Sequence, residues 1–340
     1  MSTHLLRPCL RIGHHWPHHS TSLSRYLSSA QSAAHVAFIG LGNMGMQMAI
    51  HLAKGTNLIV YDLHSENVSR FMKLTRDRGM LAVTEARNLS TVAHSKPDFI
   101  VTSLPTCEAS ESVVGTILEH YVHNRGTTFI DTSTVSVSTS RKLYEMTTSL
   151  SHNYVDAPVS GGVKGATDAT LTFMVGCSHE TLTSIEPLLS KMGKSIIPCG
   201  GPGSGSAAKL CNNLALAAQM VGICEAMNLG EELGVDPKVL AGVMNVSTAK
   251  CWSSQVNNPH PMAAMHMGSG ASAKGYEGGF GSALMLKDLN LAMKEAAGKG
   301  LVMPVSGLTR DLYKSVDADG NGNKDFGFML QFLKQMKLRT

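Results

Sequence analysis

A lysine with an asparagine four residues further along the chain could form a site for proton transfer by the lysine. Lys209 and Asn213 lie in one predicted helix, where side chains at this spacing share a face. They follow a flexible glycine segment close to an expected domain boundary, and clefts between domains are preferred sites for small molecules. Lys209 could act as a general acid or base if burial or a neighbouring cation lowers its pKa. The alternative is a solvated surface lysine, which is the more common state of a lysine on a helix.

A glycine pattern at 40–45 indicates a dinucleotide site. Its residues are Gly40, Leu41, Gly42, Asn43, Met44 and Gly45. The pattern follows a strand-like run and precedes a helix-like one, and a second strand-like run ends at Asp62, about 20 residues downstream. The first glycine permits a tight turn, the second lets the backbone approach a pyrophosphate, and the third lets helix and strand pack closely. The N-terminus of the helix would then face the phosphates.

The acidic residue of this pattern predicts which cofactor is used. Asp62 would accept hydrogen bonds from the ribose hydroxyls and would repel a 2′-phosphate, so NAD is favoured over NADP. The alternative, a purely structural glycine turn, is less consistent with the flanking elements.

A third candidate site is the turn that contains Ser160, Gly161 and Gly162. It follows a strand-like run, and its small residues expose backbone N–H groups that could form an anion-binding nest for a substrate carboxylate. An ordinary turn fits the same residues equally well.

The elements that must position these residues fall into two halves. Short apolar runs alternate with helical patterns up to Cys199, which predicts a Rossmann-type, doubly wound, mostly parallel sheet over 34–199. Helical patterns then dominate, at about 206–233, from Pro237, and at 282–298, 304–316 and 325–337. We therefore predict an all-helical C-terminal domain over 200–340 for substrate binding and dimerisation, with a long loop at 257–281.

Composition excludes several classes of protein. The net charge of +4 is spread along the chain, and no apolar run reaches the ~18 residues that a membrane span needs, so neither nucleic acid nor a membrane is an expected partner. From Met1 to Tyr61 there is no Asp or Glu, whereas the same stretch carries Arg7, Arg11 and Arg25 and many Ser and His residues. Such a segment is typical of a transit peptide, which we place at 1–33, and it predicts a location in the mitochondrial matrix.

Taken together, these segments resemble the 3-hydroxyisobutyrate dehydrogenase branch of the β-hydroxyacid dehydrogenase family. The resemblance rests on 38–45, 156–162, 205–213 and 286–289, and it extends from about residue 35 to the C-terminus. The stretches 171–176, 225–230 and 251–254 resemble the mitochondrial branch in particular.

The resemblance implies a role for each matching residue. Lys209 would be the catalytic acid or base, with Asn213 holding the substrate. The expected cofactor contacts beyond the glycine turn are Leu104, Pro105, Thr134 and Lys287, with Asp288 supporting Lys287. The expected substrate contacts are Ser160, Gly161, Gly162 and Trp252. The implied reaction is the NAD-dependent oxidation of 3-hydroxyisobutyrate to methylmalonate semialdehyde in valine degradation, and it needs no metal.

Some positions depart from the family pattern or allow another interpretation. Ala109 stands where an asparagine is common, so no cofactor contact is assigned to it, and Lys164 stands where a glycine is usual. The segment 317–325 resembles an EF-hand loop, but Phe328 occupies the position of the bidentate glutamate, and a polar turn is the better account.

Two rival functions and the assembly state complete the expectations. Related reductases of glyoxylate or succinic semialdehyde usually prefer NADP and carry Asn-Arg-Thr where this chain has Asp62, Leu63 and His64. A non-enzymatic interaction protein of the same fold would be expected to lose the lysine. The helical domain should also associate into a homodimer or homotetramer, since two-fold symmetry is the commonest arrangement.

Overall fold

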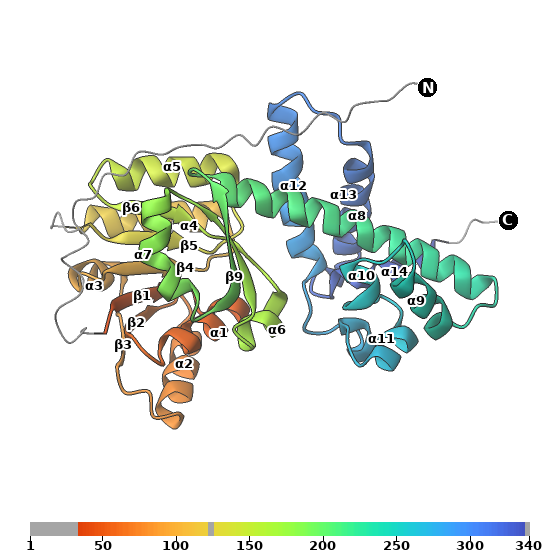
Figure 1. Cartoon of the computed structure of the whole chain (residues 1–340), viewed down its shortest axis with the longest axis horizontal. Coiled ribbons are helices and arrows are strands. Elements are labelled where there is room, and N and C mark those ends of the chain that lie inside the picture. Colours follow the sequence, from red (N-terminus) through yellow and green to blue (C-terminus); the bar gives the residue numbers. More distant parts are fainter. Residues whose placement is uncertain (1–32, 122–125, 337–340) are drawn as a thin grey trace, which may run out of the picture. The chain divides into compact units, whose positions relative to one another are not determined.

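The computed structural model describes residues 33–121 and 126–336, and residues 34–340 form one compact unit (Figure 1). Apart from Ala33, the predicted transit peptide lies outside the described residues. The predicted fold class is confirmed: a mostly parallel sheet with helices on both sides is followed by a helical domain.

The sheet begins with six parallel strands in the order β3-β2-β1-β4-β5-β6. Their bounds are His35–Ile39 (β1), Asn57–Tyr61 (β2), Val83–Glu85 (β3), Phe99–Thr102 (β4), Thr128–Asp131 (β5) and Asn153–Asp156 (β6). The chain winds outward from β1 in one direction and from β4 in the other. In sheets of this kind, ligands bind beyond the carboxyl ends of the strands at that switch point.

Three further strands extend the sheet beyond β6. They are β7 (Val159–Ser160), β8 (Leu171–Gly176) and β9 (Gly193–Gly200). Strand β8 runs antiparallel to β6 and β7, whereas β9 runs parallel to β8. The short strands β3 and β7 are additions to the expected elements.

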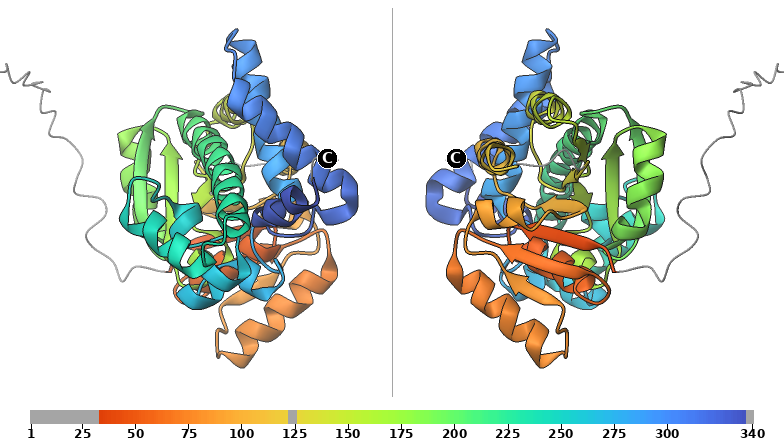
Figure 2. Two further views of the ribbon diagram at one scale, coloured as in Figure 1. Left: turned by 90° about the vertical axis from the view of Figure 1, so that its right-hand side faces the viewer. Right: turned by 90° about the vertical axis from the view of Figure 1, so that its left-hand side faces the viewer.

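Residues of the central strands alternate between two apolar layers. Val36 and Phe38 of β1 face one layer, which helices α1 (Asn43–Leu52), α2 (Ser65–Asp77), α6 (Gly162–Thr167) and α7 (His179–Leu189) help to form. Ala37 and Ile39 face the other, with α3 (Leu89–His94), α4 (Cys107–Glu119) and α5 (Val137–Thr148). Because both faces are covered, the strands are almost continuously apolar. Figure 2 shows α2 beside the edge of the sheet formed by β2 and β3.

Helix α8, Ser204–Glu232, links the sheet to the helical domain. It packs against α12 (Ser282–Gly298), α13 (Pro304–Val316) and α14 (Met329–Gln335). The smaller helices are α9 (Pro237–Val246), α10 (Trp252–Gln255) and α11 (Pro261–Met267). By length and composition alone α8 could cross a membrane, but Met220, Cys224 and Met227 on it are fully buried in the core of this domain, which accounts for its apolar character.

Several boundaries match their predictions and others do not. The helices predicted at 282–298 and 304–316 are confirmed. Gly234, with φ +82°, follows the end of α8, where a glycine in this conformation commonly caps a helix. The prediction of a loop at 257–281 is wrong in part, because it contains α11 and a 3₁₀ turn at Ala271–Lys274. The last helix is shorter than predicted, since a 3₁₀ turn at Phe326–Phe328 precedes α14.

The EF-hand-like segment forms a polar turn between α13 and α14. It begins as a π-helical turn over Asp317–Asn321. Asp325, which would be a ligand at loop position 9, is buried and accepts hydrogen bonds from Asn257 Nδ2 and the Phe280 N–H. Its carboxylate therefore holds the turn against the helical domain.

Candidate active site

The three glycines of the turn after β1 have three different environments. At Gly40, with φ +95°, an added Cβ would lie 2.3 Å from the Ser103 carbonyl oxygen, so the turn is pressed against the loop that follows β4. At Gly45, a Cβ would lie 1.9 Å from the Gly40 carbonyl oxygen. At Gly42, no heavy atom lies within 4 Å. Only the middle glycine therefore faces open space, where a pyrophosphate could approach the backbone.

The start of α1 can receive an anion. Gly42 is the N-cap of α1, and no side chain caps the free N–H groups of the first turn. These groups carry the positive end of the helix dipole. The residues present therefore fit the pyrophosphate of a dinucleotide.

Asp62 lies just beyond the end of β2 and faces the glycine turn. Its Oδ2 accepts a hydrogen bond from the Leu41 N–H at 2.5 Å, and its Oδ1 accepts one from the His64 N–H at 2.8 Å. Asn67 Nδ2 also donates to Oδ1 at 3.2 Å. A carboxylate has about four acceptor positions, so capacity remains for a ribose hydroxyl.

The loops after β4 and β5 contact each other, and both contact Lys287 of α12. The Leu104 N–H donates to Ser133 Oγ at 2.8 Å. Lys287 Nζ, from α12, donates to the carbonyl oxygens of Thr134 at 2.8 Å and Pro105 at 3.3 Å. Four residues predicted as cofactor contacts are thus held together at the carboxyl ends of two neighbouring strands.

Lys209 is buried, with 8% of its surface exposed, so the surface-lysine interpretation is wrong. Its Nζ donates to Asn213 Oδ1 at 3.0 Å, and Asn213 Nδ2 donates to Asp288 Oδ2 at 2.6 Å. Lys287 Nζ lies 3.2 Å from Asp288 Oδ1. A continuous polar chain therefore joins Lys209 to the loops that carry Pro105 and Thr134.

The surroundings of Lys209 tune its basicity. Burial, which disfavours the ammonium form, lowers the pKa of Lys209 to about 8. The carboxylate of Asp288 opposes this shift, and the positive charge of Lys287 adds to it. An amine with such a pKa can both accept and return a proton near neutral pH.

The other predicted substrate contacts lie outside this polar chain. Gly161 and Gly162 have φ values of +133° and +64°, and they form the exposed start of the short helix α6. Trp252, at the start of α10, is 45% exposed, and its ring stacks on Phe326 at a centroid separation of 6.3 Å. Ser160 lies on the edge strand β7. Their contact with a substrate remains a prediction.

The two positions that depart from the family pattern have local partners. Lys164 pairs with Asp168, the residue that follows the end of α6, and both side chains are exposed. The Ala109 N–H donates to Thr106 Oγ1 at 3.1 Å, which caps the start of α4.

Three acidic residues at the site were missed by sequence reasoning. Asp131 Oδ1, at the end of β5, accepts hydrogen bonds from Thr102 Oγ1 and the Ser133 N–H. Asp156, at the end of β6, accepts two N–H groups at the start of α8, and burial raises its pKa to about 6. The sequence could have indicated both residues, because each lies directly at the end of a predicted parallel strand, and ligands bind beyond the carboxyl ends of such strands.

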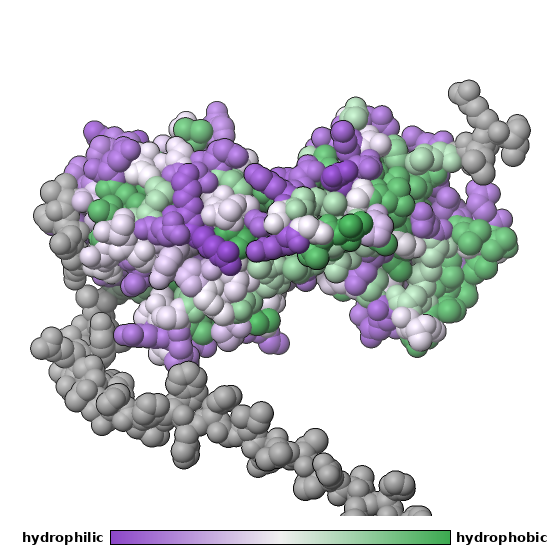
Figure 3. Space-filling model, turned by 90° about the horizontal axis from the view of Figure 1, so that it is seen from above, coloured by the Kyte–Doolittle hydropathy of each residue, from purple (hydrophilic) through white to green (hydrophobic). Residues whose placement is uncertain are grey.

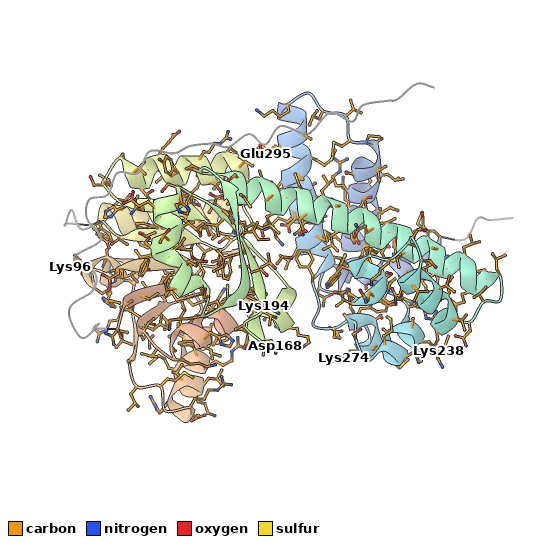
Figure 4. All side chains as sticks on the ribbon, viewed as in Figure 1. Lys96, Asp168, Lys194, Lys238, Lys274 and Glu295 are labelled. Atoms are coloured by element: carbon orange, nitrogen blue, oxygen red, sulfur yellow. The ribbon has the colours of Figure 1, made fainter. Side chains whose placement is uncertain are left out.

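The third missed residue is Glu295 on α12, which links the helical domain to the start of α5. Glu295 Oε1 accepts the Val137 N–H at 3.0 Å at the start of α5, and Figure 4 labels it near this contact.

A cavity of about 380 Å³ lies between the start of α4 and α12. Its walls include Thr106, Lys287 and Lys294, so it borders the Lys287 end of the polar chain.

Known proteins match this arrangement over nearly the whole described chain. Residues 35–201 match a family model for the NAD binding domain of 6-phosphogluconate dehydrogenase, and residues 203–333 match one described as NAD-binding of NADP-dependent 3-hydroxyisobutyrate dehydrogenase. The probable mitochondrial 3-hydroxyisobutyrate dehydrogenase of Dictyostelium discoideum is 40% identical over 313 residues, which cover 92% of this chain and 94% of that protein.

Two further relatives extend the comparison. The mitochondrial 3-hydroxyisobutyrate dehydrogenase of Homo sapiens is 40% identical over 311 residues, 90% of this chain and 89% of that protein. A solved structure of Mycobacterium tuberculosis 3-hydroxyisobutyrate dehydrogenase with L-serine has 35% identity and a TM-score of 0.79, and it covers 89% of this chain and 99% of that chain.

Proposed function

The chain belongs to the 3-hydroxyisobutyrate dehydrogenase family, and from this premise we propose that it oxidises 3-hydroxyisobutyrate to methylmalonate semialdehyde with Lys209 as the general base. It is an NAD-dependent oxidoreductase by family. The observation that carries the proposal is the buried pair of Lys209 and Asn213 at the end of a polar chain that reaches the cofactor loops.

The proposed mechanism assigns each step to residues of this chain. NAD held by the glycine turn and Asp62 would supply the hydride acceptor for the carbon that bears the hydroxyl group. Neutral Lys209 takes the hydroxyl proton, and the ammonium that forms stays hydrogen-bonded to Asn213 Oδ1. Because Asp288 holds the Asn213 amide group, the amide oxygen keeps facing Lys209. The backbone N–H groups of the Ser160–Gly162 turn would bind the substrate carboxylate, and Trp252 would form a wall of the substrate pocket.

The cofactor loops supply the second part of the site. Leu104, Pro105 and Thr134 would lie along the cofactor, and Lys287 fixes the last two through their carbonyl oxygens. The carboxylate of Asp62 would bind the ribose and disfavour a 2′-phosphate. The description of the second family model mentions NADP, but an acidic residue at this position supports NAD.

A steady-state assay over a panel of substrates tests this function. 3-Hydroxyisobutyrate with NAD should give the highest kcat/KM, ahead of L-serine, which accompanies a related enzyme in its solved structure. Glyoxylate and succinic semialdehyde with NADPH test the rival reductases. Faster reduction of either aldehyde than oxidation of 3-hydroxyisobutyrate would reject the proposed substrate, and inactivity over the whole panel would favour a non-enzymatic role.

We also propose that the protein works in the mitochondrial matrix after removal of residues 1–33. Relatives named mitochondrial support a mitochondrial location, and the acid-free segment from Met1 to Tyr61 supports an import signal. Mass spectrometry of the N-terminus of the native protein tests the proposal. A new N-terminus between about residues 28 and 34 is expected, whereas an intact Met1 on matrix protein would contradict it.

The helical domain supports association into a homodimer or homotetramer. Large apolar side chains are exposed along the end of α8 and on α9, and Figure 3 shows apolar surface gathered at this end of the helical domain. They include Leu229, Leu233, Val239, Val243 and Val246. Monomers rarely expose apolar patches of this kind. Light scattering should give an even-numbered oligomer, and Val243→Asp should shift it toward monomer; a monomeric parent protein at micromolar concentration would contradict the proposal.

A further inference from the structure

The buried carboxylates of Asp131 and Asp156 lie side by side at the carboxyl ends of β5 and β6. One contacts the cofactor loops and the other contacts the helix that carries Lys209. Asp131 and Asp156 are register partners on the parallel strands β5 and β6, and they are 2% and 1% exposed. Placing two like charges together in a protein interior is costly unless each carboxylate is well hydrogen-bonded. Their partners show which neighbouring segment each carboxylate holds.

Asp131 holds the loops that are predicted to contact the cofactor. Its Oδ1 accepts the Ser133 N–H at 3.0 Å, and the Ser133 hydroxyl in turn accepts the Leu104 N–H at 2.8 Å. Tyr154 donates its hydroxyl to Asp131 Oδ2 at 3.3 Å. This carboxylate therefore fixes, through Ser133, the loop that follows β4 and contains Leu104.

Asp156 instead holds the first turn of α8. Its Oδ1 accepts the Gly203 N–H and its Oδ2 accepts the Ser206 N–H, both at 2.8 Å. Because each oxygen of the carboxylate binds a different N–H group, the start of α8 is held at two points. Gly176 leaves the room that this requires, because a Cβ there would lie 2.3 Å from Asp156 Oδ1.

The same turn is also pressed onto the sheet backbone. A Cβ at Gly205 would lie 2.2 Å from the Met174 carbonyl oxygen and 2.7 Å from that of Asp156. Lys209 follows Ser206 by three residues, which is less than one helical turn. Any shift of the first turn of α8 therefore moves Lys209 with it.

We propose that Asp156 is a positioning residue for Lys209: by binding two N–H groups at the start of α8, it sets where the Lys209 amine lies relative to the cofactor loops. This inference rests on the proposed role of Lys209 as the general base. A misplacement of a reacting group by about 1 Å can lower a rate by about 10²-fold. A function so sensitive to position explains why a carboxylate is kept buried beside another.

Asp156→Asn is the first test, measured on the full-length enzyme above pH 7. The amide has nearly the same shape but only one acceptor oxygen, so one of the two N–H groups loses its partner. We expect kcat to fall at least about 10-fold, with KM for NAD unchanged, because Asp62 and the glycine turn lie elsewhere. Water that enters beside the loosened helix should move the rising limb of the pH–rate profile to higher pH, since less burial raises the pKa of Lys209.

Ser140→Ala is the matched control. Ser140 Oγ bonds Ser206 Oγ at 2.7 Å, so this variant also removes a buried polar contact of the same turn but leaves both N–H anchors in place. It should keep kcat within about twofold of the parent value. Asp131→Asn should instead raise KM for NAD, because it loosens the Leu104 loop.

If Asp156→Asn does not fold, Asp156→Glu decides, since it keeps the charge and moves the carboxylate by one methylene. A variant that folds and retains the parent kcat and pH profile, with only a lower melting temperature, would overturn the positioning role. Failure of the proposed function is distinguishable, because it would appear as undiminished turnover in Lys209→Ala.

Discussion

The glycine turn and the Lys209 cluster are built in different ways. In the turn, Asp62 bonds the backbone of Leu41 across 21 positions of sequence, and the whole motif lies within one strand-helix-strand unit. In the cluster, Asn213 and Asp288 are 75 positions apart, and Lys287 reaches Pro105 across 182. A local unit can be recognised from its own sequence, whereas the cluster exists only after two domains have packed.

The difference also separates binding from proton transfer. The groups that face the cofactor phosphates are backbone N–H groups, whose position depends on the turn and not on side-chain chemistry. The groups that handle the proton are side chains, whose pKa depends on burial and on neighbouring charges. Substitutions in the two regions should therefore change different kinetic constants.

Substitution of Lys209 gives the largest expected effect and tests this separation directly. Lys209→Ala should lower kcat by at least about 10²-fold, the usual size of a general acid-base contribution, and leave the affinity for NAD nearly unchanged. Lys209→Arg should be almost as inactive, since a guanidinium cannot release its proton near neutral pH. Steady-state kinetics and NAD titration measure the two effects.

The exposed Lys194, labelled in Figure 4, provides the control for charge removal. Lys194→Ala should behave like the parent enzyme. If Lys209→Ala binds NAD and turns over at the parent rate, the base lies elsewhere and the proposed mechanism is wrong.

Two glycines of the same turn should give different results when each is changed to alanine. Gly42→Ala adds a methyl group in open space, so the fold should be kept while KM for NAD rises about 10-fold, through hydrogen bonds lost to the pyrophosphate. Gly45→Ala places a methyl group 1.9 Å from a backbone oxygen, so the melting temperature should fall as well. Thermal unfolding with and without NAD distinguishes them, and equal melting temperatures would contradict the assigned roles.

The sequence could predict the local parts of this molecule and not the parts made by packing. Apart from β3, the parallel strands were visible as apolar runs, because both faces of the sheet are covered, and α12 and α13 followed their apolar periodicity. Strand β3 has three residues and β7 has two, too few to show a period. The prediction of a loop over 257–281 was wrong in part because α11 is short and lies in a segment rich in glycine. Pro261, at its first position, signals the start of a helix, but the composition of the whole segment favoured a loop.

The candidate site shows the same division. The glycine turn and Asp62 could be assigned from spacing alone. Spacing also made Lys209 a candidate, but the resemblance to a family was needed to assign its role and to add Lys287. No property of the sequence could show that Lys209 is buried, since a lysine on a helix is usually exposed. The parts played by Asp131 and Asp156 depend on which N–H groups lie above the strand ends, and only the packed structure determines that.

The pH dependence should follow the protonation state of Lys209. Because the pKa of Lys209 is about 8, the amine is mostly protonated at lower pH and cannot accept the hydroxyl proton. Oxidation should therefore quicken about 10-fold per pH unit below this value and level off above it. The reverse reduction needs the ammonium form and should slow as pH rises. A flat profile for oxidation between pH 6 and 9 would contradict this role.

Asp62→Asn should change the choice of cofactor by a smaller factor. The amide forms a weaker hydrogen bond with the ribose than the carboxylate does, and it no longer repels a 2′-phosphate. We expect the ratio of kcat/KM for NAD to that for NADP to fall about 10-fold, since each factor of 10 requires only about 1.4 kcal/mol. The exposed Asp77 serves as the control, and an unchanged ratio would show that another residue selects the cofactor.

Lys287 joins the two regions, so its removal should produce the smallest but most informative change. Lys287→Met removes the donor to the Pro105 and Thr134 carbonyl oxygens and the partner of Asp288. A partly exposed ion pair contributes about 0–1 kcal/mol, so KM for NAD should rise and kcat should fall by no more than about fivefold each. The Lys287 charge also lowers the pKa of Lys209, so the rising limb of the oxidation profile should move to higher pH. Lys299→Met, on an exposed lysine just beyond α12, should change none of these values. If Lys287→Met alters only KM for NAD and leaves the pH profile in place, the cofactor loops and the Lys209 cluster act independently.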